Sequence, residues 1–222
     1  MEFDKKYFES LDYSLRESMI KRFGLNVLSW ASKKIGSNLF DGKGKKALDV
    51  GCSFGYITSL LERMKYETYG LDVSTYALRE AARKRKTYAH LLACDVQCPL
   101  PFPQKTFDLI TCFDVLEHLE NPAKALENMY EVCKGVIICT TPHRLLDKAL
   151  KTLGGDYDET HINLRTPGEW RKIIEKKLGI SPDNLFIETY YEVPIRLSNR
   201  LLAFKSIKMP KIGLNIRILI KV

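Results

Sequence analysis

Residues 45–58, KKALDVGCSFGYIT, decide the fold that this sequence predicts. The apolar run at 47–50 is typical of a short buried strand, and a helix is expected to begin at Tyr56. Between them, Gly51 and Gly55 allow a tight turn and a close approach to a ligand, because glycine has no Cβ. The first N–H groups of the helix lack partners within it and point to whatever lies above the turn. This stretch therefore predicts a nucleotide-binding corner.

Predicted strands and helices alternate through the rest of the chain. Beyond the first strand, apolar runs predict strands at 68–73, 89–94, 107–113, 136–140, 185–191 and 215–222. Such alternation is typical of a doubly wound α/β sheet. The last two strands lack a clear crossover helix between them, which favours an antiparallel edge. We therefore predict a seven-stranded, mostly parallel, Rossmann-like sheet whose last strand is antiparallel.

The length and composition are those of an ordinary globular domain. The chain has 222 residues, 45% apolar and 28% charged, so we expect a single domain over residues 1–222. No apolar run approaches the ~20 residues of a membrane-spanning helix, and the first 18 residues carry charges throughout. We expect a cytoplasmic protein without a transmembrane segment. Among the six cysteines only Cys94 and Cys98 are close in sequence, which favours reduced thiols over a zinc site.

The net charge of +8 is concentrated near the C-terminus. Residues 161–222 carry 12 basic and 5 acidic side chains, whereas the preceding part is nearly neutral. Such an excess can bind an anionic substrate, a membrane surface or nucleic acid, or it can be a solvated face. Residues 194–213 form a basic insertion between the last two predicted strands. Its apolar stripe of Leu197, Leu201 and Phe204 predicts an amphipathic helix that meets a membrane or an anionic or lipid-like acceptor, or acts as a lid.

Two well-known motifs fit the nucleotide-binding corner poorly. A dinucleotide fingerprint, G-x-G-x-x-G, fails because Ser53 and Tyr56 occupy the second and third glycine positions. Residues 51–55 do match G-x-S-x-G, the nucleophile elbow of serine hydrolases. That elbow follows several strands in its own fold, whereas about 46 mostly helical residues precede this one. Ser53 is therefore interpreted as a turn residue rather than a nucleophile.

Acidic residues at the ends of the next two strands narrow the choice of ligand. Asp72 ends the second strand, where a carboxylate can accept hydrogen bonds from both ribose hydroxyls. Asp95 ends the third strand, where it can accept one from an adenine amino group. Together with Asp49 they surround one crevice with negative charge, and no basic residue in the turn serves a diphosphate. S-adenosylmethionine, a cationic sulfonium with an amine, a ribose and an adenine, fits this crevice.

Four stretches in order resemble the motifs of class I S-adenosylmethionine-dependent methyltransferases: ALDVGCSFG, YGLDVS, ACDVQCPLPFPQKTFDLI and CFDVLEHLENP. They resemble the ubiquinone- and menaquinone-biosynthesis branch with its small-molecule relatives, over about residues 45–190. The resemblance implies that the methionine end, the ribose, the adenine and the sulfonium lie at the four stretches in turn. Ser53 departs from the family, which often has glycine there. The implied cofactor-binding residues are Asp49, Gly51, Cys52, Gly55, Asp72, Val73, Asp95, Val96 and Phe113.

Two histidines are the predicted catalytic residues. Methyl transfer requires a nucleophile placed in line behind the methyl group, and a base only when the nucleophile arrives protonated. His118 and His161 lie in regions where the family contacts its acceptors, so the resemblance implies that either acts as the base or hydrogen-bonds the acceptor. The alternative is structural, with His118 packed under the sheet and His161 holding the helix that follows it.

The residues around His118 leave a metal site open as an alternative. Asp114, Glu117 and His118 are spaced to share one face of a predicted helix. They resemble the E-x-x-E-H element with which ubiquinone O-methyltransferases and small-RNA 2′-O-methyltransferases hold a divalent metal, and by that resemblance His161 is the fourth ligand. Such a set suits Mg²⁺, Mn²⁺ or Zn²⁺. Aspartate shortens the first ligand, however, and similar sequences occur in methyltransferases without metal, so we assign no metal here.

The first 40 residues predict a helical segment with Tyr7, Phe8 and Tyr13 on it. In similar enzymes such a segment closes over the cofactor as a lid. The alternative is an amphipathic helix that simply docks on the sheet.

The sequence as a whole predicts an enzyme that transfers a methyl group from S-adenosylmethionine to a small-molecule acceptor that it does not identify. O- or C-methylation is favoured over N-methylation. Two alternatives stay open. One is an enzyme that modifies RNA or protein through its basic C-terminal region, less favoured because no nucleic-acid recognition module is evident. The other is a non-catalytic partner subunit that only binds S-adenosylmethionine.

Overall fold

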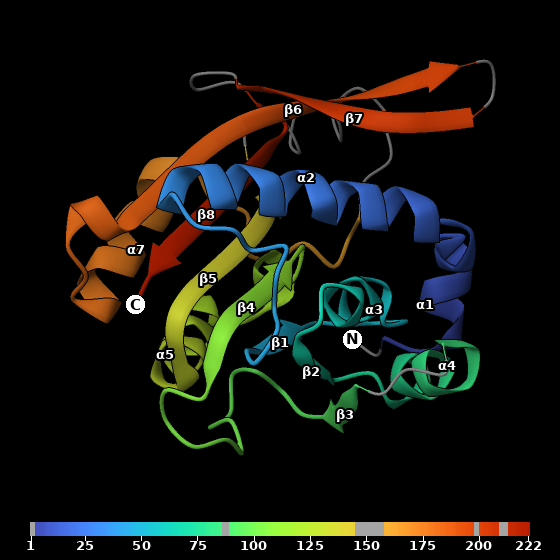
Figure 1. Ribbon diagram of the computed structural model, residues 1–222, viewed down its shortest axis with the longest axis horizontal. Coiled ribbons are helices and arrows are strands. Elements are labelled where there is room, and N and C mark those ends of the chain that lie inside the picture. Colours follow the sequence, from blue (N-terminus) through green and yellow to red (C-terminus); the bar gives the residue numbers. More distant parts are fainter. Residues whose placement is uncertain (1–2, 86–88, 145–157, 198–199, 209–212) are drawn as a thin grey trace.

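The computed structural model describes residues 3–85, 89–144, 158–197, 200–208 and 213–222, which form one β-sheet with helices on both faces (Figure 1). The strands follow the order β3-β2-β1-β4-β5-β8-β6-β7. The predicted doubly wound, mostly parallel α/β fold is confirmed. The strands are β1 (Lys46–Val50), β2 (Glu67–Asp72), β3 (His90–Ala93), β4 (Phe107–Phe113), β5 (Cys133–Pro142), β6 (Leu185–Leu197), β7 (Arg200–Lys208) and β8 (Asn215–Lys221).

Strand direction places the carboxyl ends of five strands along one edge of the sheet. Each of β3, β2, β1, β4 and β5 pairs in parallel with its neighbour. β8 pairs antiparallel with both β5 and β6, which confirms the predicted antiparallel last strand. In doubly wound sheets, ligands bind outside the carboxyl ends of the parallel strands.

The helix predicted within residues 194–213 is wrong. Residues 194–197 complete β6, and Arg200–Lys208 form β7, a strand beyond the seven predicted. β6 pairs with β8 only as far as Tyr190, so the rest of β6 needs another hydrogen-bonding partner along its length. Antiparallel pairing with β7 supplies that partner. The resulting hairpin extends along one edge of the molecule in Figure 1.

Helices fill a separate apolar core on each face of the sheet. Leu28 of α2 and Leu61 of α3 are fully buried on one face, and Met129 of α5 and Trp170 of α7 on the other. No helix among the described residues has the length and apolar character needed to cross a membrane. The helices are α1 (Lys5–Ser10), α2 (Glu17–Ile35), α3 (Tyr56–Arg63), α4 (Thr75–Arg85), α5 (Pro122–Val132) and α7 (Pro167–Leu178).

A buried ion cluster fastens α2 to the antiparallel part of the sheet. Glu188 of β6 accepts a hydrogen bond from the Trp30 indole at 2.9 Å and pairs with Lys34 at 2.6 Å. It also pairs with Arg217 of β8 at 3.1 Å. The Arg217 guanidinium lies over the rings of Trp30 and Tyr190, at 4.5 and 4.8 Å from their centroids. These contacts fix α2 across strands that are far from it in sequence.

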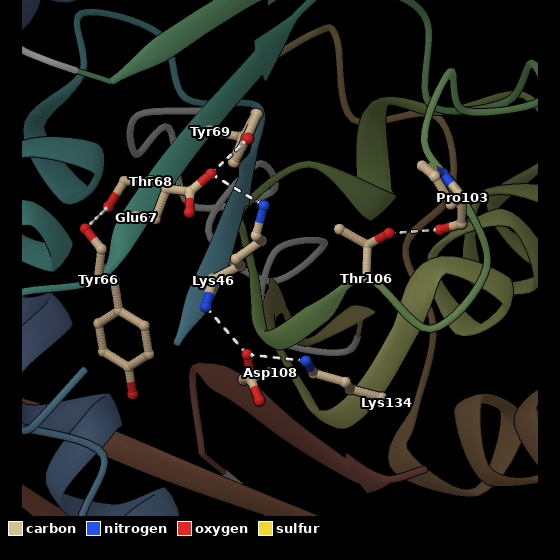
Figure 2. A network of polar contacts seen from close by, with 9 residues as sticks. All are labelled: Lys46, Tyr66, Glu67, Thr68, Tyr69, Pro103, Thr106, Asp108 and Lys134. Atoms are coloured by element: carbon tan, nitrogen blue, oxygen red, sulfur yellow. Dashed lines mark hydrogen bonds and ion pairs between the residues drawn. The ribbon is translucent and has the colours of Figure 1, made fainter. Parts of the chain in front are cut away.

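Solvated polar contacts join the amino ends of β1, β2, β4 and β5, at the end of the strands away from the carboxyl ends (Figure 2). The Asp108 carboxylate accepts a hydrogen bond from the Lys46 backbone at 2.9 Å and pairs with Lys134 at 3.4 Å. Glu67 pairs with the Lys46 ammonium at 3.0 Å and accepts a hydrogen bond from the Tyr69 hydroxyl at 2.6 Å. Because these side chains are solvated, they add little to stability individually.

The buried ion cluster gives a stability prediction. Glu188→Ala is expected to lower the free energy of unfolding by about 3–5 kcal/mol, because it removes the carboxylate from the buried Arg217 guanidinium. Urea denaturation measures the change. Glu67→Ala is the matched control, since it breaks an exposed ion pair and is expected to cost no more than about 1 kcal/mol. Equal losses in the two variants would contradict this role of Glu188.

Candidate active site

The three predicted carboxylates lie together at the carboxyl ends of neighbouring strands. Asp49 lies in β1 one residue before its end, Asp72 is the last residue of β2, and Asp95 follows β3. β2 pairs in parallel with β1 on one side and with β3 on the other. The structure therefore brings these side chains to one edge of the sheet, as predicted from the sequence.

Asp49 is buried and joins β1 to the elements beside it. Its two oxygens accept hydrogen bonds from the hydroxyls of Thr58 on α3 and Thr111 on β4, at 2.7 and 2.8 Å. Burial raises the pKa of Asp49 to about 6, against the opposing effect of these hydrogen bonds. Asp49 thus holds the nucleotide-binding corner in place.

The turn after β1 takes left-handed backbone conformations at alternate residues. The φ angles of Gly51, Ser53 and Gly55 are 69°, 48° and 71°. A Cβ at Gly51 would lie 2.2 Å from Cγ2 of Val115, which belongs to the segment after β4. Glycine is required at 51 by both its conformation and this contact. Ser53 takes a left-handed conformation at a position where the family often has glycine.

Asp72 and Asp95 hold the loops that follow the strands while keeping acceptor capacity. Asp72 accepts backbone N–H groups from Ser53 at 2.8 Å and Ser74 at 2.7 Å, one on each oxygen. Burial raises the pKa of Asp72, opposed by these backbone hydrogen bonds. Asp95 accepts the Gln97 backbone N–H at 2.8 Å. A carboxylate oxygen has two lone pairs, so further hydrogen bonds to a ribose or an adenine are possible at both residues.

The remaining predicted cofactor-binding residues differ in how far their side chains are exposed to solvent. Val73 is 57% exposed and presents an apolar surface beside Asp72. The side chains of Cys52 and Val96 are buried, so their backbones offer the available contacts. Phe113 is half-buried and meets Phe23 of α2 edge to face, with ring centroids 5.7 Å apart.

The N-terminal segment (residues 3–15) covers the nucleotide-binding corner and also contacts His118. Phe8 is buried in an aromatic cluster against the start of α3 and α4. The Phe3 carbonyl accepts a hydrogen bond from the Ser74 hydroxyl at 2.5 Å. The ring of the same Phe3 lies 5.6 Å from His118, centroid to centroid, in an edge-to-face contact. One residue therefore contacts both the loop after Asp72 and a predicted catalytic histidine.

The two predicted catalytic histidines meet with one carboxylate. Potential ligand atoms of Glu117, His118 and His161, here called the Glu–His cluster, lie within 4.8 Å of one another. Asp114 is not among them, and its carboxylate accepts a hydrogen bond from Thr140 at 2.9 Å. The helix predicted over this region is also wrong. Asp114 has a φ of 53°, and a single 3₁₀ turn, Leu116–His118, follows it.

Burial shifts the pKa values of Glu117 and His118 in the Glu–His cluster. Glu117 is fully buried, and neither of its oxygens has a hydrogen-bond partner among the described residues. Burial, then the nearby Asp114 carboxylate, raise the pKa of Glu117 well above its usual value. Burial, then His161, lower the pKa of His118 to about 4, so its ring is neutral near pH 7.

The sequence did not predict a role for Asp158 and Thr160, which lie next to the Glu–His cluster. The Thr160 hydroxyl lies 2.7 Å from Nδ1 of His118, and it donates a hydrogen bond to Asp158 at 2.6 Å. Both belong to the sequence DETH, which ends in His161. The Asp-x-Thr-His spacing was the available signal, but it does not show that the segment packs against His118.

Part of this chain matches a known protein family. Residues 48–139 match the protein family described as "Methyltransferase domain". Over these residues the chain is similar to methyltransferase domains. The resemblance inferred from sequence is confirmed, and the cofactor of this domain class is S-adenosylmethionine.

Curated relatives of the methyltransferase domain include ubiquinone biosynthesis O-methyltransferases. The mitochondrial enzyme of Schizosaccharomyces pombe is 33% identical over 122 residues, which cover 50% of this chain and 42% of that protein. The enzyme of Actinobacillus pleuropneumoniae is 32% identical over 125 residues, covering 51% and 53%. An 18S rRNA (guanine-N(7))-methyltransferase of S. pombe is 28% identical over 116 residues, covering 52% and 38%. The chain spans about half the length of the curated relatives that it matches.

Solved methyltransferases share the fold over nearly the whole chain. A methyltransferase from Archaeoglobus fulgidus has a TM-score of 0.68 at 18% identity and covers 99% of this chain and 100% of its own. Magnesium protoporphyrin IX methyltransferase from Synechocystis, solved with bound S-adenosylhomocysteine, has a TM-score of 0.63 at 17% identity, covering 98% and 97%. At such identities the likeness shows the fold alone.

The ribose assignment of Asp72 gives a binding prediction for the methyltransferase domain. Asp72→Ala is expected to weaken S-adenosylhomocysteine binding about 10- to 100-fold, because hydrogen bonds to a charged acceptor contribute about 1.5–3 kcal/mol each. Calorimetric titration measures the affinity, and thermal unfolding checks that the variant folds. Asp183→Ala, at an exposed position remote in sequence, is the control and should bind like the wild type. Unchanged affinity in Asp72→Ala would contradict the assignment.

Proposed function

We propose that the chain transfers the methyl group of S-adenosylmethionine to a hydroxyl oxygen of a small-molecule acceptor. The observation that carries this proposal is the Glu–His cluster, whose carboxylate is buried without a hydrogen-bond partner among the described residues. The neutral imidazole of His118 in this cluster can receive a hydroxyl proton. The contact of Gly51 with Val115 brings the segment that bears the cluster against the cofactor corner.

Relatives support an oxygen acceptor. Two of the curated relatives are named ubiquinone biosynthesis O-methyltransferases, and their similarity spans about half of this chain. We infer that the acceptor is a hydroxylated small molecule. The basic C-terminal part of the sequence suits an acceptor that also carries negative charge.

The proposed mechanism assigns separate tasks to the two halves of the site. S-adenosylmethionine supplies an activated methyl group on a sulfonium, so the acceptor oxygen forms a bond to that carbon as the carbon–sulfur bond breaks. Asp72 and Asp95 hold the ribose and the adenine, while Gly51, Cys52 and Gly55 give the methionine end close access to backbone. Asp49, Val73, Val96 and Phe113 complete the proposed cofactor site. The N-terminal segment acts as a lid that excludes water.

The acceptor proton leaves through the Glu–His cluster. An imidazole of the cluster, His118 or His161, accepts it as the oxygen attacks. The donor set of Glu117, His118 and His161, one carboxylate oxygen and two imidazole nitrogens, also suits a divalent cation. Such a cation would lower the pKa of a bound hydroxyl and would give the buried Glu117 carboxylate a counter-charge. The oxygens of Glu117 have no hydrogen-bond partner among the described residues, and this is the reason to consider the cation.

Methyl transfer is testable with labelled cofactor. The protein is incubated with S-adenosylmethionine bearing a deuterated methyl group and with catechol or a cell-derived small-molecule extract. We expect mass spectrometry to find the label on a hydroxyl oxygen of a small-molecule product. Glu117→Gln should lower the rate about 10²-fold without weakening S-adenosylhomocysteine binding, whereas Glu120→Gln at an exposed position should not. EDTA should lower the wild-type rate if a cation takes part.

Label on bulk RNA, with none on small molecules, would contradict the proposal. That outcome would favour the RNA-modifying alternative, for which the similarity to an rRNA (guanine-N(7))-methyltransferase is the specific support. Cofactor binding without label on any acceptor would favour a non-catalytic binding subunit.

A further inference from the structure

A chain of hydrogen bonds leads from Asp158 to the Glu–His cluster. Oδ1 of Asp158 accepts the Thr160 backbone N–H at 2.9 Å and the Thr160 hydroxyl at 2.6 Å. Oγ1 of Thr160 then lies 2.7 Å from Nδ1 of His118, and the Thr160 carbonyl oxygen lies 3.3 Å from the same nitrogen. The side chain of Thr160 is therefore interposed between a carboxylate and an imidazole.

The directions of these hydrogen bonds determine which ring nitrogen of His118 carries the proton. Against the effect of burial, the hydrogen bonds from Thr160 lower the pKa of Asp158, so its carboxylate is ionised and Oδ1 accepts the Thr160 hydroxyl proton. With its only proton donated, Oγ1 of Thr160 can interact with His118 only as an acceptor. The Thr160 carbonyl can likewise only accept. Both contacts therefore require a proton on Nδ1, which leaves Nε2 of the neutral ring without one.

We propose that Asp158 and Thr160 are positioning residues that keep the proton of His118 on Nδ1, so that Nε2 keeps its lone pair. A lone pair on Nε2 is what either a proton acceptor or a cation ligand requires, and a partner on the other ring nitrogen is the usual way to fix it. The inference deepens the proposed function and rests on it for its catalytic meaning. The tautomer itself is a property of the protein alone.

The N-terminal segment completes the network from the other side. The Tyr7 hydroxyl of α1 donates a hydrogen bond to Oδ2 of Asp158 at 3.2 Å, and Nε2 of His161 lies 4.0 Å from the same oxygen. Burial, then Asp158, raise the pKa of Tyr7, so its hydroxyl stays protonated and acts as the donor. Docking of the N-terminal segment therefore also orients the carboxylate that directs Thr160.

Nuclear magnetic resonance reads the tautomer directly. The protein, labelled with ¹⁵N at histidine and kept free of metal with EDTA, is examined at pH 7 by long-range ¹H–¹⁵N correlation. This measurement separates protonated from unprotonated ring nitrogens. The chain has four histidines, and the loss of one set of signals in His118→Gln assigns His118. We expect the wild type to show a protonated Nδ1 and an unprotonated Nε2.

Variants test the assigned roles one by one. Thr160→Val and Asp158→Ala should shift His118 to a mixture of tautomers or to the form protonated on Nε2. Thr160→Ser keeps the hydroxyl and should restore the wild-type pattern. Tyr7→Phe should give a smaller shift, and Asp183→Ala and Tyr191→Phe, at exposed positions, are the controls. S-adenosylhomocysteine binding and thermal unfolding show whether each variant remains folded.

A wild-type ring protonated on Nε2 would overturn the inference, as would an unchanged His118 pattern in both Thr160→Val and Asp158→Ala. If a variant fails to fold, the wild-type spectrum together with Thr160→Ser still decides. Failure of the proposed function is distinguishable from failure of this inference. In that case the spectrum would still show His118 protonated on Nδ1, but no acceptor would be methylated. In an active enzyme, kcat should fall with the loss of the Nδ1 proton while the affinity for S-adenosylhomocysteine is kept.

Discussion

The site depends on the close approach of two segments, the turn after β1 and the segment after β4. Gly51 leaves no room for a Cβ, because Val115 lies where one would be. Glu117 and His118 follow Val115 by two and three residues. The absence of one side chain therefore lets the cofactor corner and the Glu–His cluster adjoin. Asp49 reinforces the same junction through its hydrogen bonds to Thr58 and Thr111, which tie β1 to α3 and β4.

The N-terminal segment connects the two halves of the site a second time. Through Phe3 it contacts Ser74 on the cofactor side and His118 on the acceptor side. Through Tyr7 it reaches Asp158, which directs Thr160. A segment that closes over bound cofactor would then also order the residues that orient His118. In this arrangement, exclusion of water and orientation of the His118 ring would be one event.

The sequence predicted the features that depend on local chemistry. The glycine turn, the carboxylates at successive strand ends and the parallel sheet follow from residue types and spacing, and the structure confirms the fold. The strand β7 was not predictable, because the apolar residues Leu197, Leu201 and Phe204 also fit a helical period. The left-handed Asp114 was missed because residue spacing does not report φ. The pairing of Thr160 with His118 joins residues 42 positions apart, and only tertiary packing shows it.

A crystal structure of the protein with S-adenosylhomocysteine tests most directly whether the corner and the Glu–His cluster form one active site. We expect a single site in which the ribose hydroxyls bind Asp72 and the sulfur faces the Glu–His cluster across the Gly51–Val115 contact. An adenosine bound away from the ends of β1, β2 and β3, or a sulfur directed away from Glu117, His118 and His161, would contradict it.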